Sequence, residues 1–186
     1  MRAQIKLGRL WSIEIGLHYS GILTAVLIIL SLANHFSGVN AALNDAAAAW
    51  LRATVTSLLF FAAVLVHEMS YAAVAKIRGL TVKSITLFAF GGVTKLEKET
   101  NADAAEFWMG NVALIMSFAV GLVFFGLARA FGGSGESASA FEPFVAMLVW
   151  FGTVNIALAI INLLPGYPFD GGRVLRAVIW RMTGNS

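Results

Sequence analysis

Residues 58–75 read LLFFAAVLVHEMSYAAVA, an apolar run with His67 and Glu68 side by side in its middle. A run of this kind has the composition of a membrane-spanning helix. An ionisable side chain at that depth costs about 3 kcal/mol or more unless a partner compensates its charge. Two adjacent ionisable residues therefore predict a functional site. The usual compensator of a His-Glu pair on a helix is a metal ion.

The composition predicts an integral membrane protein. Of the 186 residues, 59% are hydrophobic and only 12% are charged, and the mean hydropathy is +0.80. A soluble domain carries about twice this charged fraction. Because the chain has no cysteine, any metal must be held by histidine, carboxylate or another oxygen. The sequence pI is about 9.5, but the basic residues flank hydrophobic segments, which favours a topology signal over nucleic-acid binding.

Four segments are predicted to cross the bilayer. Each approaches or exceeds the ~20 residues that a ~30 Å hydrocarbon core requires at 1.5 Å per residue. The first follows basic residues, as a signal peptide does, but it contains His18 and lacks a clear small-x-small cleavage site, which favours a retained helix. The predicted spans cover residues 16–33, 54–75, 105–130 and 143–164.

Lysine and arginine are distributed unevenly between the predicted connections. Eleven lie in the N-terminal segment, in the connection after the second span and in the C-terminal tail, whereas Arg52 and Arg129 lie on the other side. By the positive-inside rule, both termini are predicted to be cytoplasmic. Trp11, Trp50 and Trp108 fall near the predicted interfaces and fit an aromatic belt.

A short segment between the second and third spans has β character. Residues 80–96 read LTVKSITLFAFGGVTKL, rich in β-branched and aromatic residues and interrupted by two glycines. The pattern predicts a β-hairpin over about residues 81–96. The hairpin either connects two helices or contributes to a site.

The fourth predicted span ends in NLLPGYPFDGGR, residues 162–173. Its prolines and glycines break the helix and free backbone groups that lipid does not satisfy, and such backbone is tolerated where it lines a cavity or a site. Asp170 lies next to this break, at a depth similar to that of His67 on an antiparallel span. The two side chains are predicted to meet across the bundle in a carboxylate-plus-imidazole metal site.

These segments resemble the site-2 protease family of intramembrane zinc metalloproteases. The matching pieces are residues 66–76, the hairpin with Phe90-Gly91-Gly92-Val93, Asn155, and residues 162–176. The resemblance covers essentially the whole chain, which looks like a short member or a piece of a longer one. It implies a single membrane-embedded domain over residues 1–186. The expected fold is that of an all-α membrane protein, with about four transmembrane helices and a small β-hairpin between the second and third.

The resemblance also implies roles for individual residues. In the family, a His-Glu-x-x-His helix supplies two zinc ligands and a general base, and the aspartate of the later motif is the third ligand. His67 and Asp170 would be zinc ligands, and Glu68 would activate a zinc-bound water. Two asparagines would steady the substrate or its oxyanion. For Asn162, an interhelical hydrogen bond is an equal alternative. The asparagines are Asn162 and Asn155, and the hairpin residues expected to hold a substrate strand are Phe88, Phe90, Gly91 and Gly92.

The sequence departs from the family motif at position 71, where Tyr71 replaces the expected second histidine. Three accounts stay open. In the first, Tyr71 ligates the metal as a phenolate, which requires the metal to displace its proton. In the second, His18 of the first span substitutes as a ligand. The third account is poor zinc binding and a catalytically inactive chain. A milder departure is Gly110-Asn111 in the third span, where family members often have a Gly-Pro step.

The expected function is zinc-dependent cleavage of transmembrane segments of other proteins, in a bacterial or archaeal cell membrane. The implied cofactor is zinc, and the implied partners are a transmembrane protein substrate and the lipid bilayer, with no nucleic acid. The alternative is a pseudoprotease that binds transmembrane helices or regulates a partner, which Tyr71 favours. An ion or proton carrier using Glu68 and Asp170 explains neither the adjacent histidine nor the hairpin.

Overall fold

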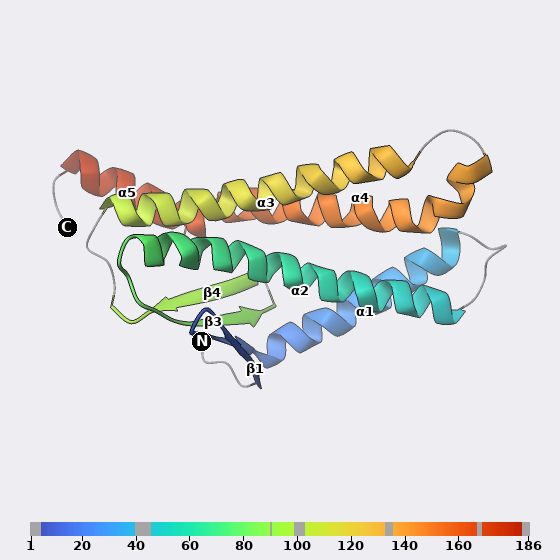
Figure 1. The fold of residues 1–186 in the computed structure, drawn as a ribbon, viewed down its shortest axis with the longest axis horizontal. Helices are drawn as coiled ribbons and strands as arrows, with labels where there is room; N and C mark the ends of the chain where they lie inside the picture. Colours follow the sequence, from blue (N-terminus) through green and yellow to red (C-terminus); the bar gives the residue numbers. More distant parts are fainter. Residues whose placement is uncertain are drawn as a thin grey trace.

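The computed structural model describes residues 5–39, 46–89, 91–98, 103–132, 136–166 and 169–183. Helices form most of it, and a small sheet lies at one end of the long helices (Figure 1). The strands are β1 (Ile5–Leu10), β2 (Ile13–Leu17), β3 (Val82–Phe88) and β4 (Gly91–Leu96). The helices are α1 (Tyr19–Val39), α2 (Ala46–Ile77), α3 (Asp103–Phe131), α4 (Glu136–Asn162) and α5 (Asp170–Thr183).

Three helices are long and apolar enough to cross a membrane. They correspond to Ala46–Ile77 in α2, Ala104–Phe131 in α3 and Phe144–Asn162 in α4. The predicted second, third and fourth spans fall within or close to these helices. The spans fit a membrane protein, whereas the cytoplasmic location of the termini stays a prediction.

The predicted first span differs from the structure at its beginning. Residues 16 and 17 belong to strand β2, and helix α1 begins only at Tyr19. The apolar part of α1, Tyr19–His35, is shorter than the three candidate spans. A fourth crossing therefore stays a prediction. Hydrophobicity alone did not mark the boundary, because Ile13, Ile15 and Leu17 are as apolar as the helix that follows.

The sheet is larger than the predicted hairpin. The antiparallel pairing of β3 with β4 is confirmed, with Thr86 opposite Val93 and Phe88 opposite Gly91. The N-terminal strands β1 and β2 form a second antiparallel pair, and β2 runs parallel to β3. The strand order is β1-β2-β3-β4, so β4 is an edge strand. The expected all-α class is thus wrong in this respect: a four-stranded sheet accompanies the helices.

The N-terminal hairpin lacks the usual sequence signal of a tight turn. Trp11 and Ser12 form the turn with φ of 51° and 64°. Positive φ at both central residues of a two-residue hairpin normally selects Asn-Gly or similar pairs. Strand β1 is also exposed along its whole length, so no buried alternation marks it. The sequence marks this region as a basic segment before the first predicted span, with Trp11 near the membrane interface.

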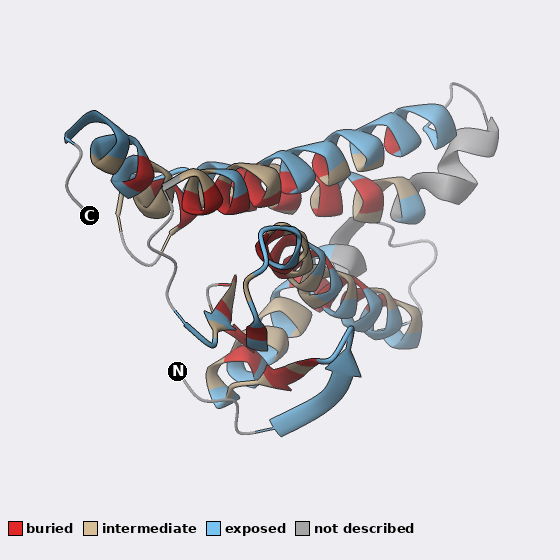
Figure 2. Ribbon diagram, turned by 60° about the vertical axis from the view of Figure 1, so that its left-hand side comes forward, coloured by how far each residue is buried: buried red, intermediate tan, exposed pale blue. Residues whose placement is uncertain are grey.

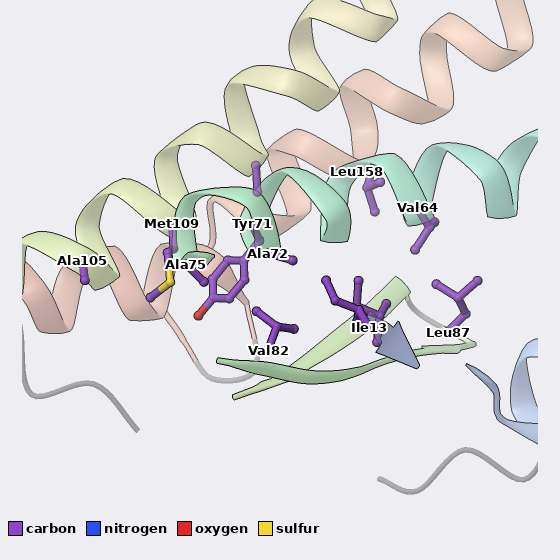
Figure 3. Close-up of a cluster of buried hydrophobic side chains, with 12 residues drawn as sticks. Ile13, Val64, Tyr71, Ala72, Ala75, Val82, Leu87, Ala105, Met109 and Leu158 are labelled. Carbon is purple, nitrogen blue, oxygen red and sulfur yellow. The ribbon is translucent and has the colours of Figure 1, made fainter. Parts of the chain in front are cut away.

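The core lies where α2 packs on the sheet and on the inner faces of α3 and α4. Helix α2 contacts β3 and β4 on one side and α3 and α4 on the other. Figure 2 shows burial concentrated on these inner faces, while the outer faces of the helices are exposed. Large apolar side chains on the outer faces suit contact with lipid. Figure 3 shows the main buried cluster, which includes Ile13, Val64, Tyr71, Val82, Met109 and Leu158.

Small residues bring α3 and α4 together along their length. A Cβ atom at Gly121 would lie 3.0 Å from the carbonyl oxygen of Gly152, and one at Gly152 would lie 3.1 Å from that of Gly121. Close backbone approach at small residues is a common way of packing helices in membranes. The two helices run side by side (Figure 1) and position the segment after α4, which carries part of the candidate site.

Candidate active site

Helix α2 presents three polar side chains toward the interior at the sheet end of the bundle. His67, Glu68 and Tyr71 have only 3%, 8% and 3% of their surface exposed. His67 and Tyr71 are four residues apart and therefore lie on one face of the helix, one turn from each other. Burial of this kind requires partners for each polar atom.

His67 is held at both ring nitrogens. Its Nε2 atom lies 2.8 Å from Oδ2 of Asp170, and its Nδ1 atom lies 2.8 Å from the hydroxyl of Ser117 on α3. Ser117 is 2% exposed. The imidazole therefore links three helices, α2, α3 and α5. Ser117 carries no signal in the sequence, because a single serine in an apolar helix has no characteristic spacing.

Asp170 occupies the first position of α5, directly after the break that follows α4. Aspartate is favoured at helix N-termini because its carboxylate interacts with unpaired backbone N–H groups and the helix dipole. Two glycines allow the tight packing. A Cβ at Gly171 would lie 2.6 Å from the carbonyl oxygen of Leu164, and a Cβ at Gly110 of α3 would lie 3.3 Å from that of Asp170. The Gly110 position thus supports the site through packing.

Glu68 is fixed by strand β4. The hydroxyl of Thr94 donates a hydrogen bond of 2.6 Å to Oε2 of Glu68. A Cβ at Gly92 would lie 2.8 Å from the Cδ atom of Glu68 and closer still to its Cγ. Only glycine therefore lets β4 approach the glutamate so closely. Gly92 was among the predicted site residues, whereas Thr94 was not.

Tyr71 has a partner on α5. The guanidinium of Arg173 donates a hydrogen bond to the Tyr71 hydroxyl and also lies over the tyrosine ring, 4.9 Å from its centroid. Arg173 belongs to the quoted C-terminal motif, but no role was predicted for it. The position of the expected second histidine is therefore filled by a tyrosine that binds an arginine.

Two small cavities adjoin these side chains. The larger, of about 150 Å³, is lined by His67 and Glu68 from α2 and by residues of β3, β4, α4 and the α4–α5 connection. The smaller, of about 20 Å³, lies between Tyr71, Arg173 and β4. Glu68, Gly92 and Asn162 line both cavities. The remaining lining residues of the larger cavity are Val64, Phe88, Gly91, Leu158 and Phe169.

The other predicted site residues lie as follows. Asn162 lines the cavities, and its amide donates to the Leu158 carbonyl at 2.9 Å. Asn155 is 1% exposed, donates to the Phe151 carbonyl and lines neither of these cavities. His18 hydrogen-bonds Ser20 at the start of α1 and also lines neither. Phe90 lies outside the described residues.

The donor set fits a metal ion in part. A catalytic zinc site uses three protein donors and one open position. His67 and Asp170 bring an imidazole nitrogen and a carboxylate oxygen to one point. Within the described segments, no group of three or more His, Asp or Glu side chains is placed to hold a metal ion. The residues therefore offer two ligands, and the oxygen of Tyr71, a further candidate donor, is engaged by Arg173.

Comparison with known proteins finds relatives that are named as zinc metalloproteases. The model of peptidase family M50 matches residues 129–186. "Putative zinc metalloprotease sll0528" of Synechocystis sp. is 42% identical over 137 residues, which are 73% of this chain and 34% of the relative. "Putative zinc metalloprotease Rip3" of Mycobacterium tuberculosis is 35% identical over 186 residues, which are 100% of this chain and 46% of the relative. The chain thus spans less than half the length of either relative.

A solved structure has the same fold. The "Site-2 Protease from Methanocaldococcus jannaschii" superposes with a TM-score of 0.67 at 29% sequence identity, covering 97% of this chain and 74% of that protein. Taken together with the two relatives and the peptidase-family match, this similarity shows that the chain belongs to the site-2 protease family of metalloproteases.

Proposed function

We propose that the protein hydrolyses a peptide bond within a membrane segment of another protein. The observation that carries the proposal is the placement of Glu68 beside the His67–Asp170 pair, at a cavity whose wall includes edge strand β4. A metalloendopeptidase needs these three parts together: a base, a metal-binding pair and room for an extended substrate.

Zinc, which the names of the relatives imply, would be held by His67 and Asp170. When bound, zinc supplies Lewis-acid polarisation of a carbonyl and makes water a stronger acid. His67 is fixed for this role by the hydrogen bond from its other nitrogen to Ser117. Such an outer contact holds the ring plane and the tautomer of a ligand histidine.

Glu68 is the proposed general base. Its carboxylate lines both cavities, so an attacking water there lies within its reach. The Thr94 hydroxyl holds one carboxylate oxygen, which leaves the other to accept a proton from the water and to deliver it to the leaving amine. Asn162, which lines both cavities together with Glu68, is the proposed donor to the developing oxyanion.

Strand β4 is the proposed docking edge for the substrate. A membrane-spanning helix has its carbonyls hydrogen-bonded, so it must unwind before hydrolysis. As an edge strand, β4 offers main-chain groups to such an unwound segment, which the surrounding lipid does not. Phe88, Gly91 and Gly92 bring the turn end of the β3–β4 hairpin to the larger cavity, and Phe90 belongs to the same proposed docking segment.

A cleavage assay in lipid vesicles tests the proposal. The purified chain is reconstituted with a panel of single-span model proteins labelled at both ends. Cleavage by the parent protein and a loss of about 100-fold or more in Glu68→Gln are expected, because general-base catalysis contributes about 10²–10⁴-fold. Cleavage that is unchanged in Glu68→Gln would overturn the assignment of the base.

A second candidate function is that of a pseudoprotease that binds membrane segments without cleaving them. The contact between Tyr71 and Arg173 favours it, because this contact takes up the place of the second histidine. The same assay with Tyr71→His separates the candidates. The pseudoprotease is supported if only the Tyr71→His variant cleaves the model proteins. In that case the model proteins should still crosslink to β4 of the parent.

A further inference from the structure

Two contacts join α2 to α5 at corresponding positions. His67 meets Asp170, and one turn further along both helices Tyr71 meets Arg173. The spacing is four residues on α2 and three on α5, so each pair lies on the facing sides of the two helices. We call these two contacts the α2–α5 seam. In a motif with two histidines, a metal ion would bind the side chains at both of these positions of α2, 67 and 71.

The contact between Tyr71 and Arg173 is stabilised by burial of the tyrosine ring and by two interactions with the arginine. The tyrosine ring belongs to the main buried cluster together with Val82 and Met109 (Figure 3). Its hydroxyl ends at the smaller cavity, where the guanidinium of Arg173 both donates to it and covers the ring. A hydrogen bond and a cation–π contact to one side chain hold the arginine in two directions.

Arginine also excludes a metal ion from this place. The guanidinium is positively charged at all ordinary pH values and only donates hydrogen bonds. A divalent cation bound to the Tyr71 oxygen would have to displace Arg173 and would still face its charge at short range. The tyrosine oxygen is thus an acceptor for arginine rather than a ligand for zinc.

We propose that the Tyr71–Arg173 pair is a metal-independent anchor that replaces the second histidine ligand, with Arg173 as the positioning residue of Tyr71. The α2–α5 seam and the cavities beside it then keep their structure without zinc. Where two histidines face a metal ion, the free energy of metal binding adds to that of folding. In this chain the anchor removes that requirement. The inference holds for both candidate functions, because it concerns the seam and not the hydrolysis.

Thermal unfolding of the purified chain in detergent tests the anchor. The parent Tm is expected to respond less to EDTA or equimolar zinc than that of Tyr71→His, since the Tyr71 position adds no metal-linked stabilisation in the parent. Tyr71→Phe, which loses only the hydroxyl, is expected to lower Tm by about 3–8 °C. Tyr71→His is expected to give a Tm that rises with zinc. Arg176→Gln is the matched control for changes on α5, because Arg176 lies on the same helix as Arg173 but bonds Glu106 instead of Tyr71.

A parent Tm that falls on chelation as far as the Tm of Tyr71→His, or a Tyr71→Phe variant as stable as the parent, would overturn the proposal. A second measurement separates the anchor from general packing. Arg173→Gln is expected to lower Tm but to raise zinc affinity about 10-fold or more, because it removes a charge beside the site. An equal or weaker zinc affinity in that variant would contradict the proposed exclusion of metal. If Arg173→Gln does not fold, Tyr71→Phe and Tyr71→His still decide the question. Cleavage is measured separately, so its absence leaves the anchor intact.

Discussion

The Nε2 atom of His67 lies 2.8 Å from Oδ2 of Asp170, although 103 residues separate them in the sequence. Both side chains are buried, with 3% and 9% of their surface exposed. The contact fastens the start of α5, directly after the irregular segment that follows α4, to helix α2. It therefore connects the stability of the fold with the geometry of the candidate active site.

A double-mutant cycle measures this contact. Each of His67→Ala and Asp170→Ala is expected to lower the free energy of unfolding by about 1–3 kcal/mol, since each leaves a buried polar partner unsatisfied. The double variant should lose less than the sum, with an interaction energy of about 1 kcal/mol or more. Strictly additive losses in detergent unfolding would show that the two side chains are not coupled.

Gly92→Ala is expected to impair the site without unfolding the protein. The new methyl group overlaps the Glu68 side chain, so β4 or the glutamate must move. We expect cleavage to fall by about 10-fold or more, as small displacements of catalytic groups do. Gly126→Ala is the control, because a Cβ at that helical glycine meets nothing within 4 Å. Equal activities of the two variants would contradict the close packing of β4 on Glu68.

Thr94→Val tests the hydrogen bond that orients Glu68. Valine keeps the shape of threonine but removes the hydroxyl that donates to the carboxylate. A decrease of kcat by about 10-fold with little change in KM is expected, because a misdirected base acts on the chemical step. Thr94→Ser restores a hydroxyl and should recover most of kcat. A change confined to KM would assign Thr94 to substrate binding instead.

Ser117→Ala removes the second hydrogen bond of His67. The buried Nδ1 atom then loses its serine partner, and we expect the free energy of unfolding to fall by about 1–2 kcal/mol. Ser70→Ala on α2 is the control, since the hydrogen bond described for the Ser70 hydroxyl goes to the Val66 carbonyl of its own helix. Similar stabilities of the two variants would mean that Ser117 does not support the histidine.

Phe88→Pro tests docking of the substrate on the hairpin. Phe88 is paired with Gly91 at the start of β4, and proline removes a backbone donor there. Cleavage is expected to be lost while zinc content stays unchanged, because the metal-binding side chains lie on α2 and α5. Phe88→Leu keeps the backbone donor and should remain active. Unaffected cleavage in Phe88→Pro would exclude the docking role of the hairpin.

Much of the fold follows from simple features of the sequence. Hydropathy predicted the helices that became α2, α3 and α4, because a bilayer requires long apolar helices. The Gly-Gly step and the β-branched residues predicted the pairing of β3 and β4. The first hairpin was missed, since Trp11-Ser12 is not a turn signal and β1 has no buried face.

The candidate site was predictable where side chains follow a motif. His67, Glu68 and Asp170 stand out as ionisable residues in apolar surroundings. Their supporting partners do not. Ser117 and Thr94 are ordinary polar residues whose contacts depend on how α3 and β4 pack against α2. Arg173 lies in the motif, but its contact with Tyr71 arises only because the two helices meet in register.

Anomalous scattering at the zinc edge, measured from crystals of the protein grown with zinc, locates the metal directly. We expect a single strong peak beside Nε2 of His67 and an oxygen of Asp170, and loss of that peak in Asp170→Asn. A protein that cleaves membrane segments with no peak there, or with a peak that survives Asp170→Asn, would contradict zinc binding by His67 and Asp170.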